Sequence, residues 1–356
     1  MTKSRRLTKT TRSSIFTYGL VITAYVILQI MILTGALSSS MQGLLVPICA
    51  YVVMAISLNL TVGILGELSL GHAGFMSVGA FSGVVAAVGL ANAVPGAGLR
   101  LALAMLIGAL CAAVMGFLIG IPVLRLKGDY LAIVTLAFGE IIKSILNNLY
   151  VGIDGSGLHF GMLLTGADQL GLQNGGKVVI GGAMGISNIP QLSSFTAGFL
   201  LILVTLFIVL NLIHSRSGRA IMAQRDNRIA AESVGINVTK YKMMAFVVSA
   251  ALAGAAGTLF AMNFSTIVAN KFDFNTSILI LVFVVLGGLG NMWGSILSAA
   301  ALTILPELLR KFSNYRMLVY AIVLILVMLA TNSPSVRLFF MRLRGRKKAE
   351  EGAKNE

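Results

Sequence analysis

The residues most able to do chemistry lie in one stretch, where glycines, a carboxylate and a histidine interrupt a hydrophobic segment. The stretch runs over 57–81 and carries Gly63, Gly66, Glu67 and His72 among apolar residues. Backbone that leaves the helical conformation inside a bilayer must be buried in protein or line a cavity, because lipid offers no hydrogen-bond partners. Broken helices at membrane depth are a common way to form a transport path. The expected pathway residues are therefore Asn59, Glu67, Ser69 and His72, with a structural role in capping the broken backbone as the alternative for Glu67.

A second glycine-rich break follows late in the chain. It contains Gly287, Gly288 and Gly290, which we add to the expected pathway residues. Paired glycine-interrupted segments in the two halves of a chain are typical of inverted repeats around a midplane pathway. The alternative is that the glycines only allow helices to pack closely. The two segments do not otherwise align, so both interpretations stay open.

Composition places the chain among membrane proteins. Of its 356 residues, 57% are hydrophobic and 11% are charged, and long stretches such as 13–66 carry no charge. A helical crossing needs about 20 mostly apolar residues. The sequence therefore predicts an all-α membrane protein, a polytopic helical bundle of about ten transmembrane helices with glycine-broken helices. The expected spans are 15–37, 44–62, 68–90, 100–121, 129–151, 192–213, 243–263, 276–291, 293–310 and 316–332.

The distribution of basic residues predicts the orientation of the chain. The net charge is +15, from 27 lysines and arginines against 12 acidic residues. With a cytoplasmic N-terminus and alternating spans, 20 basic residues fall inside and 6 outside, with Lys143 within a span. Because cytoplasmic loops carry such an excess, both termini are expected in the cytoplasm of a bacterial inner (plasma) membrane. The charge does not indicate nucleic-acid binding, which would place a basic patch on a soluble domain.

One transmembrane domain, 15–336, is expected between a basic cytoplasmic N-terminus, 1–14, and a basic cytoplasmic tail, 337–356. Two polar segments interrupt this domain, an external loop at 152–191 and a cytoplasmic loop at 214–242. The first apolar run, about 23 residues, is longer than the 7–15 residues typical of a signal peptide. We therefore expect it to be an uncleaved first span.

The cytoplasmic loop contains a segment, 218–235, that is rich in strong helix formers and ends at Gly235, a typical C-terminal cap. Arg225, Arg228 and Glu232 follow helical spacing and are expected on one polar face. Small apolar side chains follow on another side, at Ala230, Ala231 and Val234. A short helix of this kind can lie in a groove on a partner protein. A loop helix that rests on lipid headgroups is the alternative.

This segment resembles a known motif. Ala230 and Ala231, followed by Gly235, fit the A-A-x-x-x-G core of the coupling loop of ABC importer permeases, although Ile229 stands where that pattern has Glu. The longer run 218–242 is similar to branched-chain amino acid permeases of the LivM type. The resemblance extends over about 50–335 through three more blocks, 57–75, 127–140 and 285–308. The external stretch 152–157 departs from the family, which more often has a Thr-Gly-Gly run there.

The resemblance implies a permease subunit that performs no covalent chemistry and needs no cofactor or metal. Such permeases pair with a second permease subunit, are driven by two cytoplasmic ABC ATPase subunits, and receive substrate from an external (periplasmic) binding protein. The implied substrate is a branched-chain amino acid, while related permeases carry urea or short-chain amides. The implied ATPase-coupling residues are Arg225, Asp226, Ile229, Ala230, Ala231, Glu232 and Gly235.

A different class, the ion-coupled secondary transporter, would need ionisable coupling groups within the membrane. Such groups are costly to bury and are functional candidates, and here they are Glu67, Glu140 and Lys143. Glu140 and Lys143 lie three residues apart and share a helix face, so pairing with each other is the simpler account. With only these three candidate coupling groups, the sequence speaks mildly against this class.

The sequence gives little support for a catalytic site or a cofactor site. The run 171–178 spells G-x-x-x-x-G-K, but Val178 stands where a nucleotide-binding loop needs Ser or Thr for magnesium. Cys49 and Cys111 both fall inside apolar spans and imply no disulfide or metal framework. Paired carboxylates or His/Asp clusters with useful spacing, which a membrane-embedded enzyme would need, do not occur. We therefore expect ATP hydrolysis in partner subunits.

Overall fold

The computed structural model describes residues 9–309 apart from 92, 127, 155–156, 163–169 and 173–175, together with 318, 321, 322 and 325. The chain divides into two compact units, 1–300 and 301–356. Several expectations lie wholly or mostly outside the described residues: the N-terminal segment 1–14, the span 316–332, the tail 337–356 and the centre of the run 171–178.

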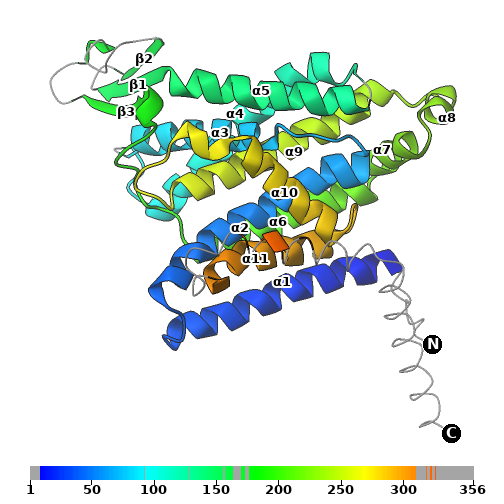
Figure 1. The fold of residues 1–356 in the computed structure, drawn as a ribbon, viewed down its shortest axis with the longest axis horizontal. Coiled ribbons are helices and arrows are strands. Elements are labelled where there is room, and N and C mark those ends of the chain that lie inside the picture. The colour runs from blue at the N-terminus through cyan, green and yellow to red at the C-terminus, as the bar shows by residue number, and fades with distance from the viewer. Residues whose placement is uncertain are drawn as a thin grey trace, which may run out of the picture. The chain divides into compact units, whose positions relative to one another are not determined.

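Apolar helices make up most of the described chain (Figure 1). They are α1 Lys9–Leu33, α2 Ser39–Asn59, α3 His72–Gly89, α4 Ala97–Val123, α5 Asp129–Asn147, α6 Phe195–His214, α9 Val238–Ala261, α10 Phe274–Gly287 and α11 Met292–Leu308. Six of these, α2 to α6 and α9, are long and apolar enough to cross a membrane, whereas α10, α11 and the apolar part of α1 are shorter. The expected helical membrane bundle is confirmed, and nine of the ten expected spans overlap these helices.

Polar elements gather at the two ends of the long helices. Strands β1 Leu149–Asp154, β2 Gly157–Met162 and β3 Lys177–Gly181 form an antiparallel sheet in the order β2-β1-β3. Figure 1 shows this sheet at one end of α5, and helices α7 Arg216–Asp226 and α8 Arg228–Ser233 at the other. We call these the hairpin end and the α7 end. The sequence predicted the polar segment around the sheet, but not its strands.

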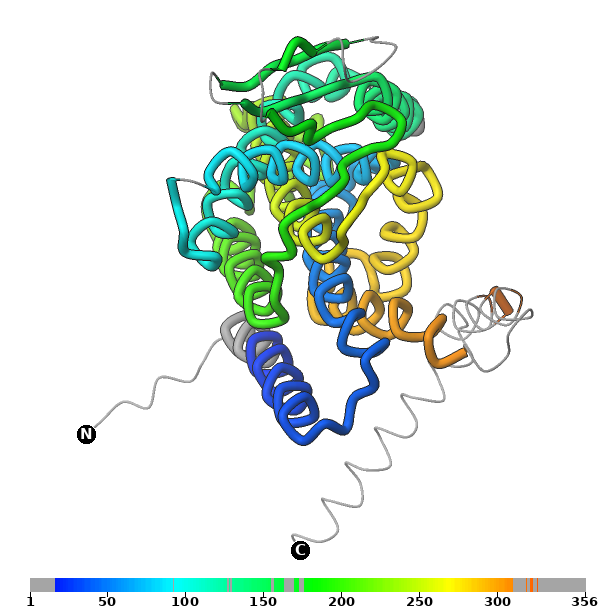
Figure 2. Tube along the Cα trace, turned by 90° about the vertical axis from the view of Figure 1, so that its left-hand side faces the viewer, coloured from blue at the N-terminus to red at the C-terminus, as the bar shows by residue number. Residues whose placement is uncertain are grey.

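The core forms where α3, α4 and α9 approach closely through small residues. A methyl group at Gly79 of α3 would collide with the backbone of Gly254 in α9, and one at Gly257 would collide with that of Met76. The hydroxyl of Thr258 donates a hydrogen bond to the Gly79 carbonyl at 2.7 Å. Small residues allow such close packing within membranes, where apolar side chains gain little by leaving lipid. Helix α1 lies beside α6 (Figure 2), with Tyr25 stacked on Phe199 at 4.0 Å between ring centroids.

The expected break after α2 is present. The helix widens into a π-helical turn over Leu60–Leu65, Gly66 takes a left-handed conformation with φ of 81°, and α3 begins only at His72. Within the intervening loop, the Leu70 N–H donates to Thr135 Oγ1 on α5 at 3.1 Å. This break positions the site described next.

Candidate functional site

The segment expected to be one helix over 218–235 is two helices, α7 and α8, that meet at Asn227. The Asn227 backbone is extended, with φ of −154° and ψ of 106°, and its side-chain oxygen accepts the Ala230 N–H at 3.0 Å. An asparagine in this role is a strong N-cap, so it starts a new helix instead of continuing the first. The expected C-terminal cap is present, because Gly235 has φ of 83° and the Ile236 N–H donates to the Ala231 carbonyl at 3.1 Å.

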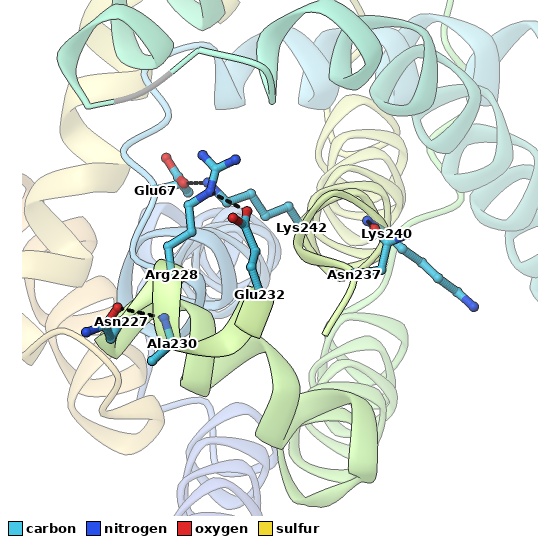
Figure 3. Close-up of polar contacts among 8 residues, drawn as sticks. All are labelled: Glu67, Asn227, Arg228, Ala230, Glu232, Asn237, Lys240 and Lys242. Atoms are coloured by element: carbon cyan, nitrogen blue, oxygen red, sulfur yellow. Dashed lines mark hydrogen bonds and ion pairs between the residues drawn. The ribbon is translucent and has the colours of Figure 1, made fainter. Parts of the chain in front are cut away.

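Helix α8 presents an exposed tip. Ile229 is 80% exposed and Val234 75%, whereas Ala231 is buried against the rest of the protein. The guanidinium of Arg228 pairs with Glu232 at 2.9 Å, with both side chains partly exposed (Figure 3). The apolar surface of the tip therefore consists of Ile229 and Val234 with Ala230, and does not include Ala231 as expected. Large apolar side chains exposed on a polar segment suit a partner surface.

Arg225 points from α7 into the break after α2, and not along a shared face with Arg228 and Glu232. Its guanidinium donates to the Gly63 carbonyl at 2.9 Å and also pairs with Asp226 at 3.0 Å. Its aliphatic stem occupies the space that a side chain at Gly66 would need. The π-helical turn leaves that carbonyl available, and Arg225 anchors α7 to it.

A buried ion pair makes the second attachment at the α7 end. Lys242, one turn into α9, pairs with Glu67 in the loop after the break (Figure 3). The Lys242 side chain is 8% exposed and that of Glu67 16%. Glu67 is among the site residues expected from the sequence, whereas Lys242 is expected only as one of the basic residues on the cytoplasmic side. Its position could have indicated a role at the membrane boundary, because Lys242 is the last charged residue before the uncharged run 243–270.

Asn59 joins the two glycine-rich breaks. Its amide nitrogen donates to Ser295 Oγ at 2.9 Å, and its amide oxygen accepts the Gly290 N–H at 2.8 Å. Asn59 is completely buried. A methyl group at Gly63 would collide with this amide and with the backbone of Gly290, and one at Gly287 would collide with Gly294. The structure therefore brings Asn59, Gly287 and Gly290 together, with Gly288 beside them at φ of 91°.

Ser69 and His72 lie farther into the bundle. His72 is 1% exposed, and its Nε2 lies 2.8 Å from the hydroxyl of Ser57. The Ser57 hydroxyl donates its proton to the Met54 carbonyl at 2.9 Å, so its hydrogen bond with His72 does not activate it as a nucleophile. Ser69 is also buried, and its hydroxyl has no hydrogen-bond partner among the described residues. Within the described part of the chain, no group of three His, Cys, Asp or Glu side chains could hold a metal ion.

A polytopic helical bundle with a polar segment attached to broken membrane helices defines an integral membrane protein built for transport. The chain belongs to the family described as branched-chain amino acid transport system / permease component, whose model matches residues 40–328. No solved structure was found to match it.

Several curated proteins are similar to this chain. It is 36% identical over 290 residues to the high-affinity branched-chain amino acid transport system permease protein LivM of Salmonella typhimurium, and equally to that of Escherichia coli. These matches cover 78% of this chain and 66% of each relative, so the chain spans about two thirds of their length. It is 28% identical to the fructose import permease protein FruG of Bifidobacterium longum, over 67% of each chain.

Proposed function

We propose that this chain is the permease subunit of an ATP-driven ABC importer for branched-chain amino acids. The observation that carries the proposal is that the α7–α8 segment is free on one side and attached to the membrane helices on the other. One side of the segment exposes Ile229 and Val234, and the other holds the break after α2 through Arg225. The family and the similarity to LivM proteins support this assignment.

The exposed tip suits a groove on a cytoplasmic ATPase. A short helix commonly docks by placing a few apolar anchors in such a groove. Closure of the ATPases would pull on α8, and Arg225 would transfer this displacement to the Gly63 carbonyl. ATP binding would then shift the populations of outward-open and inward-open states. The chain itself would carry out no covalent reaction.

The same assignment orients the chain. If α7 and α8 meet ATPases, the α7 end is cytoplasmic and the hairpin end faces outward, as the basic residues predict. The N- and C-termini are then both cytoplasmic, in the bacterial inner membrane. The partners would be two ABC ATPase subunits, a second permease subunit and an external binding protein that approaches the hairpin end.

The substrate follows from family similarity, and the experiment must therefore compare several solutes. The relatives include the fructose permease FruG and, in Lactococcus lactis, the nucleoside ABC transporter permease protein NupC, which is 27% identical over 56% of this chain. Urea, short-chain amides and ion-coupled transport remain the other expectations. Inhibition of leucine uptake by valine and isoleucine, but not by urea, fructose or adenosine, would support the proposal.

The first test is purification of the tagged chain from its native membrane in mild detergent, followed by mass spectrometry. Recovery of two ATPases and a second polytopic subunit is expected. Ile229→Asp should weaken recovery of the ATPases, because it places a charge in the docked surface. Thr239→Asp, at an exposed position just after the tip, is the matched control. Uptake by the chain alone, driven by an ion gradient, would instead assign it to the secondary transporters.

A further inference from the structure

Helices α3 and α10 begin beside each other, level with the middle of α5. The Ala73 N–H in the first turn of α3 donates to Ser277 Oγ in the first turn of α10, at 3.1 Å. Both helix starts contact the central part of α5, where Gly139 lies against Gly74 and lines a small hollow with Asp273. From this meeting point α3 leads to the hairpin end and α10 to the α7 end. Two positive helix termini therefore converge at about mid-membrane depth.

Irregular backbone reaches this depth from the hairpin end. Helix α10 has 14 residues, a length of about 21 Å, against the ~30 Å of a hydrocarbon core. The chain at 262–273, between α9 and α10, has only a short 3-10 helix, Ala269–Phe272. Such backbone is tolerated at membrane depth only where it is buried in protein or lines a water-filled cavity.

Charged and polar side chains line the junction between α5 and this irregular segment. Glu140 and Lys143 form an ion pair, and the Asn147 side chain donates to Asn270 Oδ1 at 3.0 Å. Asp273 lines the same small hollow as Glu140. We call these five residues the α5 seam. It combines both signs of charge with amide groups within a few turns of helix.

Other parts of this chain do not completely cover the α5 seam. The side chains of Glu140 and Lys143 are 39% and 23% exposed, although they lie near the middle and in the outer half of a membrane-crossing helix. Ions that face lipid at such a depth are costly and rare. The exposed side must therefore face water or another protein subunit. Because the hollow behind the seam is only about 10 Å³, about one water molecule, a solute would contact the open face.

The neighbouring face of α5 is aliphatic, with Ile133, Ile141 and Ile145 all exposed. We propose that the α5 seam is a wall of the translocation pathway that contacts the ammonium and carboxylate groups of an aliphatic amino acid. The carboxylates of Glu140 and Asp273 would face the ammonium group. Lys143 and the helix starts would face the carboxylate. The second permease subunit would close the open side. This inference rests on the proposed function.

Thiol accessibility tests the position of the seam without requiring transport. Glu140→Cys and Ser144→Cys are made with Cys111→Ser, leaving only the buried Cys49, and Ser144→Cys keeps the ion pair intact. The matched control is Leu118→Cys, whose position on α4 is apolar and 55% exposed. In the complete importer, a membrane-impermeant methanethiosulfonate should modify positions 140 and 144 at least about tenfold faster than 118, corresponding to ~1.4 kcal/mol. Leucine delivered by the binding protein should slow the modification.

Uptake by Glu140→Gln tests recognition of the charges. We expect the KM for leucine to rise about tenfold, while the liganded binding protein still stimulates the ATPases. A seam that only packs against the second subunit would give slow modification at 140 and 144 and an unchanged KM, and either result would overturn the proposal. If no ATPase copurifies with the wild-type chain, the importer assignment fails instead. The labelling contrast, measured then on the chain in its native membrane, still reports whether the seam faces water.

Discussion

Removing the carboxylate of Glu67 should destabilise the protein by leaving Lys242 buried without its partner. The Lys242 side chain is 8% exposed, so water replaces little of the lost interaction. Breaking a buried pair on one side costs about 3–5 kcal/mol. Because the Glu67 side chain keeps 16% exposure, we expect the lower end, about 3 kcal/mol, for Glu67→Gln. This corresponds to roughly a hundredfold change in the ratio of folded to unfolded protein.

The double variant Glu67→Gln with Lys242→Met distinguishes loss of the pair from loss of packing. Methionine keeps much of the lysine stem and removes the charge, so the double variant should recover to within about 1 kcal/mol of the wild type. The measurement is the unfolding free energy from a denaturant titration in detergent micelles, arranged as a double-mutant cycle. The matched control is Lys240→Met, an exposed lysine on the same helix turn, with an expected change of at most about 0.5 kcal/mol.

Two outcomes would refute this reasoning. If Glu67→Gln is as stable as the Lys240→Met control, the pair contributes nothing. If the double variant loses the sum of the two single losses, the side chains act independently and the charge of Lys242 is satisfied elsewhere.

Three other substitutions test the α7–α8 segment and the break after α2 to which it is attached. Arg225→Met should lower the uptake obtained per ATP hydrolysed about tenfold, because the Gly63 carbonyl loses its donor, and equal lowering of ATPase and uptake would contradict this. Gly63→Ala should cost about 1–3 kcal/mol of unfolding free energy, since its methyl group meets Asn59 and Gly290, whereas Gly98→Ala, where the space is open, should not. Gly235→Trp should uncouple ATPase from uptake without removing the protein from membranes, because φ of 83° disfavours a side chain, and normal uptake would count against the coupling assignment.

The spans could be predicted because their signal is local. A run of about 20 apolar residues is long enough for a crossing whatever its neighbours do, and the described boundaries mostly fall within a few residues of the expected ones. The end of α8 at Gly235 is equally local. The strands around 149–181 were missed because this stretch is rich in glycine, which weakens the alternation that reveals a strand.

The partners of the site residues could not be predicted in the same way. Asn59 meets Ser295 and Gly290 across more than 200 residues of sequence, and one sequence carries no record of such contacts. The helix expected over 218–235 places Asn227 in a helix interior, although an asparagine can instead cap a new helix with its own side chain. Whether the expected pathway residues line a transport path stays a prediction, because Asn59, Ser69 and His72 are buried in this conformation.

The contact between the two breaks has a consequence for coupling. Asn59 uses both ends of its amide to hold the start of α11, and it is completely buried. Moving the end of α2 away from Gly290 would leave a buried donor and a buried acceptor unpaired, at about 1–3 kcal/mol each. Gly63 and Gly290 also touch without a side chain between them that could adapt. A pull on Arg225 should therefore move the end of α2 and the start of α11 together as one rigid body. The loop that follows, fixed to α9 by Glu67 and Lys242, must then absorb the displacement or carry it to α3.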